Sequence, residues 1–384
     1  MNTLPLTRDE LERLVAAGDG PSISLFLPTN RFGPERQQDR RRLVHLLSQA
    51  RQAAVNEGLA MAELAGPFEA AVAFAESLPI GEAAAGIALF LGRNLLRAFH
   101  LELPVHEAFF VGHRFQVRPL LAVLEAREPF YVLAVSLHSV RVLEVDGPEV
   151  HRLDLAGVPA NIDQALGYVE YQSDLQMHSA QPSLGRKSGT MHGHGDGDEE
   201  RMKRDISRYL QLIAEALEPQ LPNREAPLVL MAVEEYFPIY RAVSRRLEQQ
   251  QVQVAGNADF LTDREIAEKA RPAIARLRKE QQSRELSRLR ELAGNGRVAA
   301  DLAAVLSAAI TGRVNHLLAA DRGELWGRFE IERSWLTART EREPADEELV
   351  NRAVLETLSH GGEVSVVRAD ELPSGQLMVA ALRY

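Results

Sequence analysis

The sequence contains no cysteine among its 384 residues. This absence excludes disulfide bonds, thiolate zinc sites and catalysis by a thiol. No apolar run approaches the roughly 18 to 20 residues of a membrane-spanning helix, so we expect no membrane span. The N-terminal stretch MNTLPLTRDELERL carries early acidic residues and no uninterrupted apolar run, so we expect no signal peptide. These absences predict a cytoplasmic protein.

Positive charge is scarce overall, because 44 Lys and Arg face 54 Asp and Glu, for a net charge of −10. This balance argues against a protein that coats nucleic acid over its whole surface, but local contact with RNA depends on how the charge is distributed. Six arginines lie between Arg31 and Arg51 against two acids, and eight Lys or Arg lie between Arg271 and Arg297 against three. Each cluster is either a solvated helix face or an RNA contact.

The chain is long enough for two or three domains, since single cores rarely grow past about 250–300 residues. The first predicted domain covers residues 1–125. Its apolar run Ile23–Leu27 predicts a buried strand, and helices are predicted over 34–57 and 67–78. The apolar runs GIALFLG, LLRAFHL and FFVGHRFQV predict several adjacent strands after them.

The second predicted domain covers residues 126–260. FYVLAVSLHSVRVLEVDG predicts a β-hairpin, and EVHRLDL can add a third strand. A long polar region over 161–198 is unusual inside a compact domain, which indicates a functional or a disordered loop. An amphipathic helix follows to about Leu217, and PLVLMAVEE then predicts a strand that is buried on both faces.

The third predicted domain covers residues 261–384 and begins with a long polar helix over 263–292. Alternating helices and strands follow, which predicts an α/β/α sandwich. The predicted elements are helix 298–310, strand 314–319, helix 345–358, and strands 364–367 and 377–382. The fold class is therefore α/β, with three α/β domains.

A glycine-rich loop tip follows the predicted hairpin and directly precedes the basic helix ERMKRDISRYLQLIAEAL. The loop tip consists of His192, Gly193, His194, Gly195, Asp196 and Gly197. This order resembles the middle domain of the archaeal and eukaryotic class-1 peptide release factors. In that family a hairpin leads to a His-Gly-Arg-Gly-Gly-Gln loop, and an Arg-rich helix and an apolar strand follow.

Both ends of the chain resemble the same superfamily, which includes Pelota. GGEVSVVRADELPSGQLMVAALRY is similar to the C-terminus of its third domain, where Gly361, Gly362 and the final Leu382, Arg383 and Tyr384 fit the pattern. SLFLPTNRFGPERQQDRRRL is similar to the N-terminal region of the divergent bacterial branch. The resemblance implies a ribonuclease-H-like middle domain and a ribosomal-protein-like C-terminal sandwich of the kink-turn-binder type.

The loop tip departs from the release-factor motif at the position that carries the chemistry. Aligned with His-Gly-Arg-Gly-Gly-Gln, the sequence has His194 at the Arg, Asp196 at the second Gly and Gly197 at the Gln. Gln176 and Gln181 lie too far upstream to replace the missing glutamine without a different loop path. We therefore expect no peptidyl-tRNA hydrolysis, no catalytic residue, no bound metal and no cofactor.

The resemblance implies a factor that binds rRNA in the A-site region of the ribosome, in rescue, stalling or hibernation. Basic residues suit contacts to RNA phosphates. The candidates near the loop tip are Arg186, Lys187, Arg201, Lys203, Arg204 and Arg208, and those on the predicted N-terminal helix are Arg36, Arg40, Arg41 and Arg42. The sequence indicates no particular protein partner.

Two other functions stay open. His192, His194, Asp196 and Asp198 alternate at a spacing that can bind Zn²⁺ or Mn²⁺, which favours a metal-dependent hydrolase. The glycines between them raise the entropic cost of ordering such a site. The third domain can also serve a non-ribosomal adaptor that binds another RNA or a protein. A surface loop without a specific role is the remaining interpretation.

Overall fold

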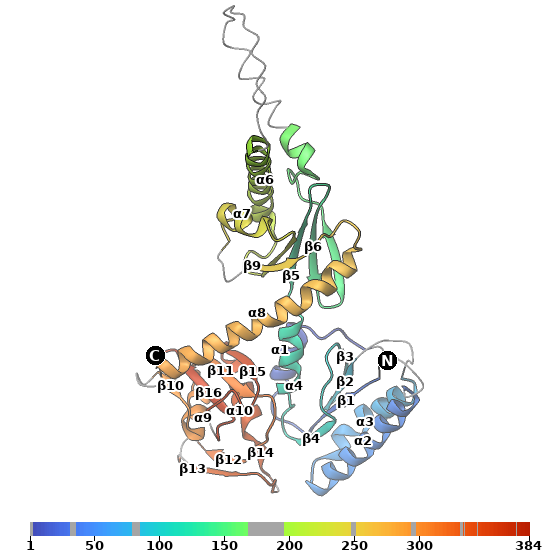
Figure 1. Ribbon diagram of the computed structural model, residues 1–384. Helices are drawn as coiled ribbons and strands as arrows, with labels where there is room; N and C mark the ends of the chain where they lie inside the picture. The colour runs from blue at the N-terminus through green and yellow to red at the C-terminus, as the bar shows by residue number, and fades with distance from the viewer. Residues whose placement is uncertain are drawn as a thin grey trace, which may run out of the picture. The chain divides into compact units, whose positions relative to one another are not determined.

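The structure is a computed structural model of the chain. It describes residues 3–30, 36–78, 85–167, 196–246, 251–292, 297–330, 333, 335–343, 345–373 and 375–384. The chain forms two compact units (Figure 1), of which the first comprises Met1–Arg127 and Gln282–Tyr384 and the second Glu128–Gln281. Both mix helices with sheets, so the predicted α/β class is confirmed. The division into three domains remains a prediction, because the first and third predicted segments share one unit.

The N-terminal part of the first unit is built on an antiparallel sheet in the order β3-β2-β1-β4. Its strands are β1 (Ser22–Pro28), β2 (Gly86–Gly92), β3 (Leu95–Leu101) and β4 (Ala108–Gly112). Alternate residues of β1 point to opposite faces. Ile23, Leu25 and Leu27 pack against helices α2 (Arg36–Asn56) and α3 (Met61–Glu76), whereas Phe26 faces a second core.

The second core of this unit joins residues from the two ends of the chain. Phe26, Phe90 and Phe115 pack in it with Val305, Leu349 and Val354. The first three come from the N-terminal sheet and the loop after β4, and the others from helices α9 (Leu302–Ile310) and α10 (Leu349–Ser359). Helices α1 (Arg8–Ala16) and α4 (Arg118–Ala126) contribute further apolar residues to the same core.

The C-terminal part of the first unit contains a mixed sheet in the order β10-β16-β11-β15. Its strands are β10 (Val298–Ala299), β11 (Val314–Ala320), β15 (Glu363–Val367) and β16 (Met378–Leu382). A separate small sheet comes from the segment between β11 and β15, and it consists of β12 (Trp326–Glu330), β13 (Trp335–Arg339) and β14 (Glu347–Glu348). The sequence patterns did not predict this sheet.

Two helices in this part begin later than their sequence patterns predicted. The predicted helix 298–310 starts at Leu302, because β10 pairs with β16 and the Asp301 carboxylate accepts from the backbone N–H groups of Ala303 and Ala304. The predicted helix 345–358 starts at Leu349, because Glu348 caps α10 through the N–H groups of Val350 and Asn351. A side chain directly before a helix can accept hydrogen bonds from the free N–H groups of the first turn, and this capping fixes the residue at which the helix begins.

The Gly361–Gly362 pair has a structural reason at the end of α10. Gly361 adopts a φ of 69°, a left-handed conformation that glycine tolerates best after a helix. A Cβ on Gly362 would lie 2.8 Å from the carbonyl oxygen of Val314, so only glycine fits between α10 and the start of β11.

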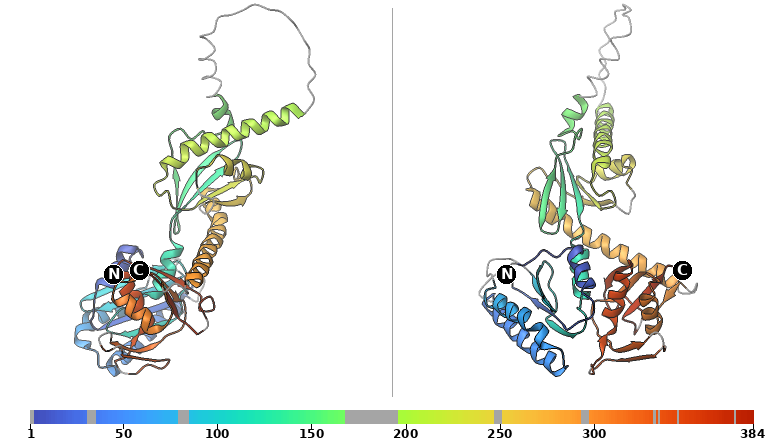
Figure 2. Two further views of the ribbon diagram at one scale, coloured as in Figure 1. Left: turned by 90° about the vertical axis from the view of Figure 1, so that its left-hand side faces the viewer. Right: turned by 180° about the vertical axis from the view of Figure 1, so that it is seen from behind.

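The second unit contains a five-stranded sheet in the order β7-β6-β5-β8-β9 (Figure 2). Strands β5 (Phe130–Val135), β8 (Leu228–Ala232) and β9 (Gln251–Ala255) are parallel, and β6 (Val140–Asp146) and β7 (Glu149–Leu153) extend the sheet antiparallel. This is the ribonuclease-H-like order that the resemblance implied. The predicted hairpin and its third strand are β5, β6 and β7.

Helices cover both faces of this sheet. Helices α6 (Asp196–Leu217) and α7 (Tyr236–Val243) pack on one face, and the first half of α8 (Asp263–Leu292) packs on the other. The start of α8 is a capping box, in which Thr262 Oγ1 accepts from Glu265 N and Glu265 Oε2 accepts from Thr262 N. Among the described residues, no helix is long and apolar enough to cross a membrane.

Asn351 provides the first testable prediction, because its buried side chain joins α10 to the loop after β4. Its Nδ2 donates to Phe115 O at 2.9 Å, and its Oδ1 accepts from Val117 N at 3.0 Å. The substitution Asn351→Ala leaves both backbone groups without this partner and should lower the free energy of unfolding by about 2–4 kcal/mol. Denaturant unfolding followed by tryptophan fluorescence measures this unit, since Trp326 and Trp335 are the only tryptophans.

Asn56→Ala is the matched control, because Asn56 is exposed at the end of α2 and accepts one bond, from Gln52. Its effect should stay within about 0.5 kcal/mol. Equal effects of the two substitutions would show that the Asn351 bridge does not hold the two ends of the chain together.

Candidate functional site

The loop tip falls largely outside the described residues. Residues 168–195 are not described, so Arg186, Lys187 and His192–Gly195 have no structural account here. Asp196 and Gly197 are the first two residues of helix α6, and their side chains are likewise outside the description. The basic residues that follow the loop tip on α6 are described.

Helix α6 is held in the second unit by one apolar stripe. Tyr209, Leu210, Ile213 and Leu217 are completely or almost completely buried against the sheet. The hydroxyl of Tyr209 also donates to Ser136 O, just after the end of β5, at 2.9 Å. Burial raises the pKa of Tyr209, so the hydroxyl keeps its proton for this bond. The opposite side of the helix is therefore left for solvent.

Three arginines line that opposite side. Arg201, Arg204 and Arg208 are spaced by three and four residues, which places them on one stripe of a helix. All three are exposed. Arg204 Nε donates to Glu200 O at 3.3 Å, and Arg208 Nη1 to Gln211 Oε1 at 3.4 Å. Because these contacts lie on α6 itself, the guanidinium groups stay at the surface; we call the three residues the α6 basic stripe.

Lys203 is exposed as well, but it directly precedes Arg204 and therefore points to another side of α6. The α6 basic stripe thus gathers three of the four predicted basic residues of this helix on one solvent-exposed side. This arrangement can contact several phosphates at once, because a guanidinium binds phosphate oxygens in a bidentate manner.

On α2, Arg40 and Arg42 form hydrogen bonds within the first unit. Arg40 donates from Nε and Nη2 to the carbonyl oxygen of Leu78 at 3.2 and 2.8 Å. Arg42 Nη1 donates to Pro28 O at 3.1 Å and to the buried Asp39 carboxylate at 3.0 Å. These bonds fasten α2 to the ends of neighbouring elements in the first unit.

Of the predicted RNA contacts on α2 whose side chains are described, Arg41 is the exposed one, and within the described residues it has no polar partner. Arg36 belongs to α2, but its side chain is outside the description. The predicted RNA contacts on this helix stay a prediction, and the structure gives Arg40 and Arg42 internal partners that a basic cluster in the sequence does not reveal.

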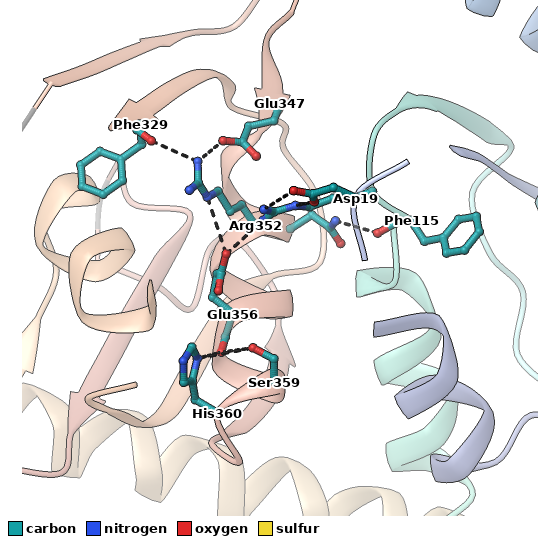
Figure 3. Close-up of polar contacts among 10 residues, drawn as sticks. Asp19, Phe115, Phe329, Glu347, Arg352, Glu356, Ser359 and His360 are labelled. Atoms are coloured by element: carbon teal, nitrogen blue, oxygen red, sulfur yellow. Dashed lines mark hydrogen bonds and ion pairs between the residues drawn. The ribbon is translucent and has the colours of Figure 1, made fainter. Parts of the chain in front are cut away.

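The sequence patterns missed a polar cleft in the first unit. It measures about 500 Å³ and lies between the end of β4 and the start of α10, so we call it the β4–α10 cleft. A chain of ion pairs runs along it (Figure 3). Arg114 pairs with Asp19 at 2.5 Å and with Glu356 at 3.0 Å, and Arg352 pairs with Glu347 and donates to Phe329 O at 3.1 Å.

The pKa values of the cleft carboxylates are shifted in opposite directions by their surroundings. The hydrogen bond from Arg114 lowers the pKa of Asp19, which is largely exposed. Burial raises the pKa of Glu347 even though Arg352 and Arg114 oppose that rise. Burial also raises the pKa of Glu348, whose carboxylate caps α10. Desolvation disfavours a charged carboxylate, whereas a hydrogen bond from a cation favours it.

A local signal for this cleft was present only on α10, where Arg352 and Glu356 are four residues apart. Such a pair is common on any exposed helix. Asp19 and Arg114 lie more than 200 residues away in the sequence, so their part in the network follows only from the folded core.

A metal site is not seen in the part of the chain that the structure describes, where no three His, Asp or Glu side chains gather closely enough to hold an ion. The His192–Asp198 alternation falls outside that part or at its edge. The metal hypothesis for the loop tip therefore stays a hypothesis.

Residues 129–313 match the family described as bacterial archaeo-eukaryotic release factor family 3. Over this segment, a little under half of its length, the chain is similar to the archaeo-eukaryotic release factors. No curated protein matches the sequence. The matched residues run from the start of the five-stranded sheet past the α6 basic stripe to the residue before β11.

Solved structures of the superfamily are similar at low identity. Archaeoglobus fulgidus Pelota has 12% identity over 99% of this chain and 93% of its own, with a TM-score of 0.35. S. cerevisiae Dom34 has 11% identity over 82% and 78%, with a TM-score of 0.39. The archaeal translation termination factor aRF1 has 15% identity over 99% of each chain, with a TM-score of 0.23.

Glu347 gives the stability of the chain a testable pH dependence. Because burial raises its folded-state pKa above the unfolded value, the folded state binds the proton more tightly. Stability from this group is present at low pH and is lost as pH rises through the folded pKa. Glu347→Gln cannot ionise, so its unfolding free energy relative to the natural chain should rise as pH rises above the ordinary range of a glutamate carboxyl.

Asp19→Asn is the opposite-sign control. The pKa of Asp19 is lowered in the folded state, so its contribution is present above the unfolded value and is lost as pH falls through the folded pKa. The relative stability of Asp19→Asn should therefore fall as pH rises through the acidic range. Denaturant unfolding at a series of pH values measures both, and slopes of the same sign would contradict the assignment.

Proposed function

We propose that this chain is a ribosome-associated translation factor that contacts rRNA through the α6 basic stripe and does not hydrolyse peptidyl-tRNA. The observation that carries the proposal is the exposed stripe of Arg201, Arg204 and Arg208 directly after the loop tip, within the residues that match the release-factor family. The proposed setting is the A-site region of a stalled or idle ribosome in the cytoplasm, in rescue, stalling or hibernation.

The charge distribution supports RNA contact at this place. A chain of net charge −10 is repelled by RNA on average, so binding needs a local surface of the opposite sign. The apolar stripe of α6 fixes the helix on its sheet, and the guanidinium groups on its other side are held by the helix alone. Phosphate contacts can then form without breaking bonds that stabilise the unit.

The α2 arginines contribute less to the proposed interface. Arg40 and Arg42 already donate to carbonyl and carboxylate oxygens of the first unit. Reversing their charge would break these bonds, so a loss of ribosome binding could not be distinguished from a loss of folding. Arg41 is the α2 residue that tests RNA contact cleanly. Arg36, Arg186 and Lys187 remain proposed contacts.

Ribosome binding is expected to be salt-dependent, since each neutralised phosphate releases counterions and contributes about 0.7–0.9 to the slope of log K against log salt. The triple substitution of Arg201, Arg204 and Arg208 to alanine should therefore reduce that slope by about 2–3. Alanine preserves helix α6, because it has the highest helix propensity. Co-sedimentation with ribosomes from the source cells, at about 50 to 200 mM salt, measures the change.

The matched control replaces three other exposed arginines of the second unit, Arg152, Arg224 and Arg264, which lie outside both basic clusters, with alanine. The net charge changes by the same amount, so general electrostatic attraction changes equally. Loss of ribosome binding in both variants, or in neither, would argue against the α6 basic stripe as the contact and favour the adaptor hypothesis.

Peptide release provides a separate prediction, because the loop tip has Gly197 where release factors have glutamine. Without an amide to orient the attacking water, the protein should release no peptide above background from termination complexes. A Gly197→Gln substitution tests whether this one residue is limiting. Release by the natural chain would overturn the proposal, and release that depends on added Zn²⁺ or Mn²⁺ and on His192 would favour the metal-dependent hydrolase.

A further inference from the structure

One phenylalanine of the second unit lies almost wholly in solvent. Phe260 is 94% exposed, which is the largest exposed fraction among the large apolar side chains that the structure describes. It lies in the loop that joins β9 to α8 (Figure 1). Burial of such a ring is favourable, and aromatic side chains contribute strongly to protein interfaces because of their large apolar area. The ring of Phe260 is therefore available to a partner.

The loop holds Phe260 in a fixed position. On one side of it, Asp259 Oδ1 accepts from Ser136 Oγ, just after the end of β5, at 2.5 Å. On the other side, Arg141 on β6 donates from Nη1 to Leu261 O at 2.7 Å. Both neighbours of Phe260 are thus bonded to the sheet. A partner that packs on the ring has little loop entropy to remove, because the loop is already ordered.

The same edge of the sheet exposes a second apolar side chain. Strands β8 and β9 are parallel, so their carboxyl ends lie at one edge of the sheet. Gly256 N donates to Ala232 O at 3.0 Å where the two strands end. Val233 follows directly and is 39% exposed. Val233 and Phe260 therefore lie on loops that leave the carboxyl ends of neighbouring strands.

Acidic side chains lie beside these two apolar residues. Glu234 and Glu235 directly follow Val233, and both are exposed, without an ion-pair partner among the described residues. Burial raises the pKa of Tyr236, and the charges of Glu235 and Asp259 raise it further. The carboxylates that follow β8 and β9 thus lie near the same phenol, and negative charge gathers at this edge.

The charge of this surface decides which class of partner fits it. We call Val233, Glu234, Glu235 and Phe260 the Phe260 edge. On the adjoining first turn of α8, the charges of the exposed Arg264 and Glu265 cancel, so the surface stays negative. Such a surface repels RNA phosphates and anionic membranes. A protein segment that combines an apolar side chain with Lys or Arg is complementary to it in both respects.

We propose that the Phe260 edge docks a short protein segment in which a large apolar side chain lies next to Lys or Arg. The apolar side chain packs on Phe260 and Val233, and its basic neighbours pair with Glu234 and Glu235. An exposed aromatic residue on a fixed loop is the anchor of such an interface, and the carboxylates select the charge of the partner.

The Phe260 edge is distinct from the proposed RNA contact. Its charge is opposite to that of the α6 basic stripe, and its residues belong to the loops after β8 and β9 rather than to α6. Peptide binding is measured without ribosomes. Failure of ribosome binding would therefore leave this proposal intact, and failure of peptide binding would leave the ribosome proposal intact.

The test uses the purified full-length chain and a library of short random peptides. The peptides that the chain enriches should share a large apolar residue flanked by Lys or Arg. A synthetic peptide of the enriched sequence, labelled with a fluorophore, then gives the dissociation constant by fluorescence anisotropy. Its affinity should fall as salt rises, because salt screens attraction between exposed charges.

Substitutions at the Phe260 edge separate the anchor from the charges. Phe260→Ser should weaken binding of the labelled peptide about tenfold or more, since the anchor is lost, whereas Phe260→Leu should keep most of the affinity. Glu234→Gln combined with Glu235→Gln should weaken binding and reduce its salt dependence. Each variant should unfold at the temperature of the natural chain in scanning calorimetry, because these side chains are exposed.

Two matched controls leave the Phe260 edge intact. Met202→Ser removes an exposed apolar side chain from α6 of the same unit. Glu149→Gln combined with Glu225→Gln removes two other exposed carboxylates of the second unit. Both controls should bind the peptide like the natural chain.

The proposal is overturned if no peptide is enriched, if the enriched sequences lack Lys and Arg, or if Phe260→Ser binds as tightly as the natural chain. It is also overturned if the controls lose as much affinity as the variants of the Phe260 edge. Binding of a single-stranded oligouridine that depends on Phe260 would assign this edge to RNA instead.

Discussion

The packing of α10 against the aromatic face of the N-terminal sheet is the contact on which the first unit depends. Leu349 and Val354 of this helix share a core with Phe26 and Phe90, and Asn351 adds two buried hydrogen bonds to the loop after β4. Hydrophobic burial supplies most of the driving force, while the asparagine fixes the register, because a shifted helix would leave its buried polar groups unpaired. The first unit is therefore made from the two end segments of the sequence, and residues 128–281, which form the second unit, lie between these segments in the sequence.

The sequence predicted elements well where the pattern was local. The period-2 and period-3.6 patterns located the hairpin, the buried strand β8 and the long helix α8, since each pattern follows from the geometry of its own element. The helix starts near Leu302 and Leu349 were predicted too early, because Ala and Glu residues have good helix propensity and the caps that stop the extension, Asp301 and Glu348, depend on side-chain geometry. The sequence patterns did not predict strands β12 and β13, because each strand is short and mixes charged with apolar residues.

The candidate sites show the same limit. The exposed α6 basic stripe could be predicted, since the apolar residues of α6 define its buried side and hence the opposite side. The internal roles of Arg40 and Arg42 could not, because the carbonyl oxygens they bind belong to Leu78 and Pro28, at the ends of other elements. A guanidinium has five donors, and a sequence cannot tell whether a carbonyl or a phosphate will receive them.

The α6 basic stripe and the buried Gln116 amide show the two opposite environments of polar groups in this chain. The arginines of the α6 basic stripe are solvated, so each phosphate contact exchanges water and counterions and adds little strain to the fold. The Gln116 amide is desolvated when the protein folds, so the cost of removing its water is included in the stability of the first unit. A solvated stripe therefore suits a large, repetitive and salt-sensitive partner such as RNA, whereas a buried polar group affects only the stability of the fold.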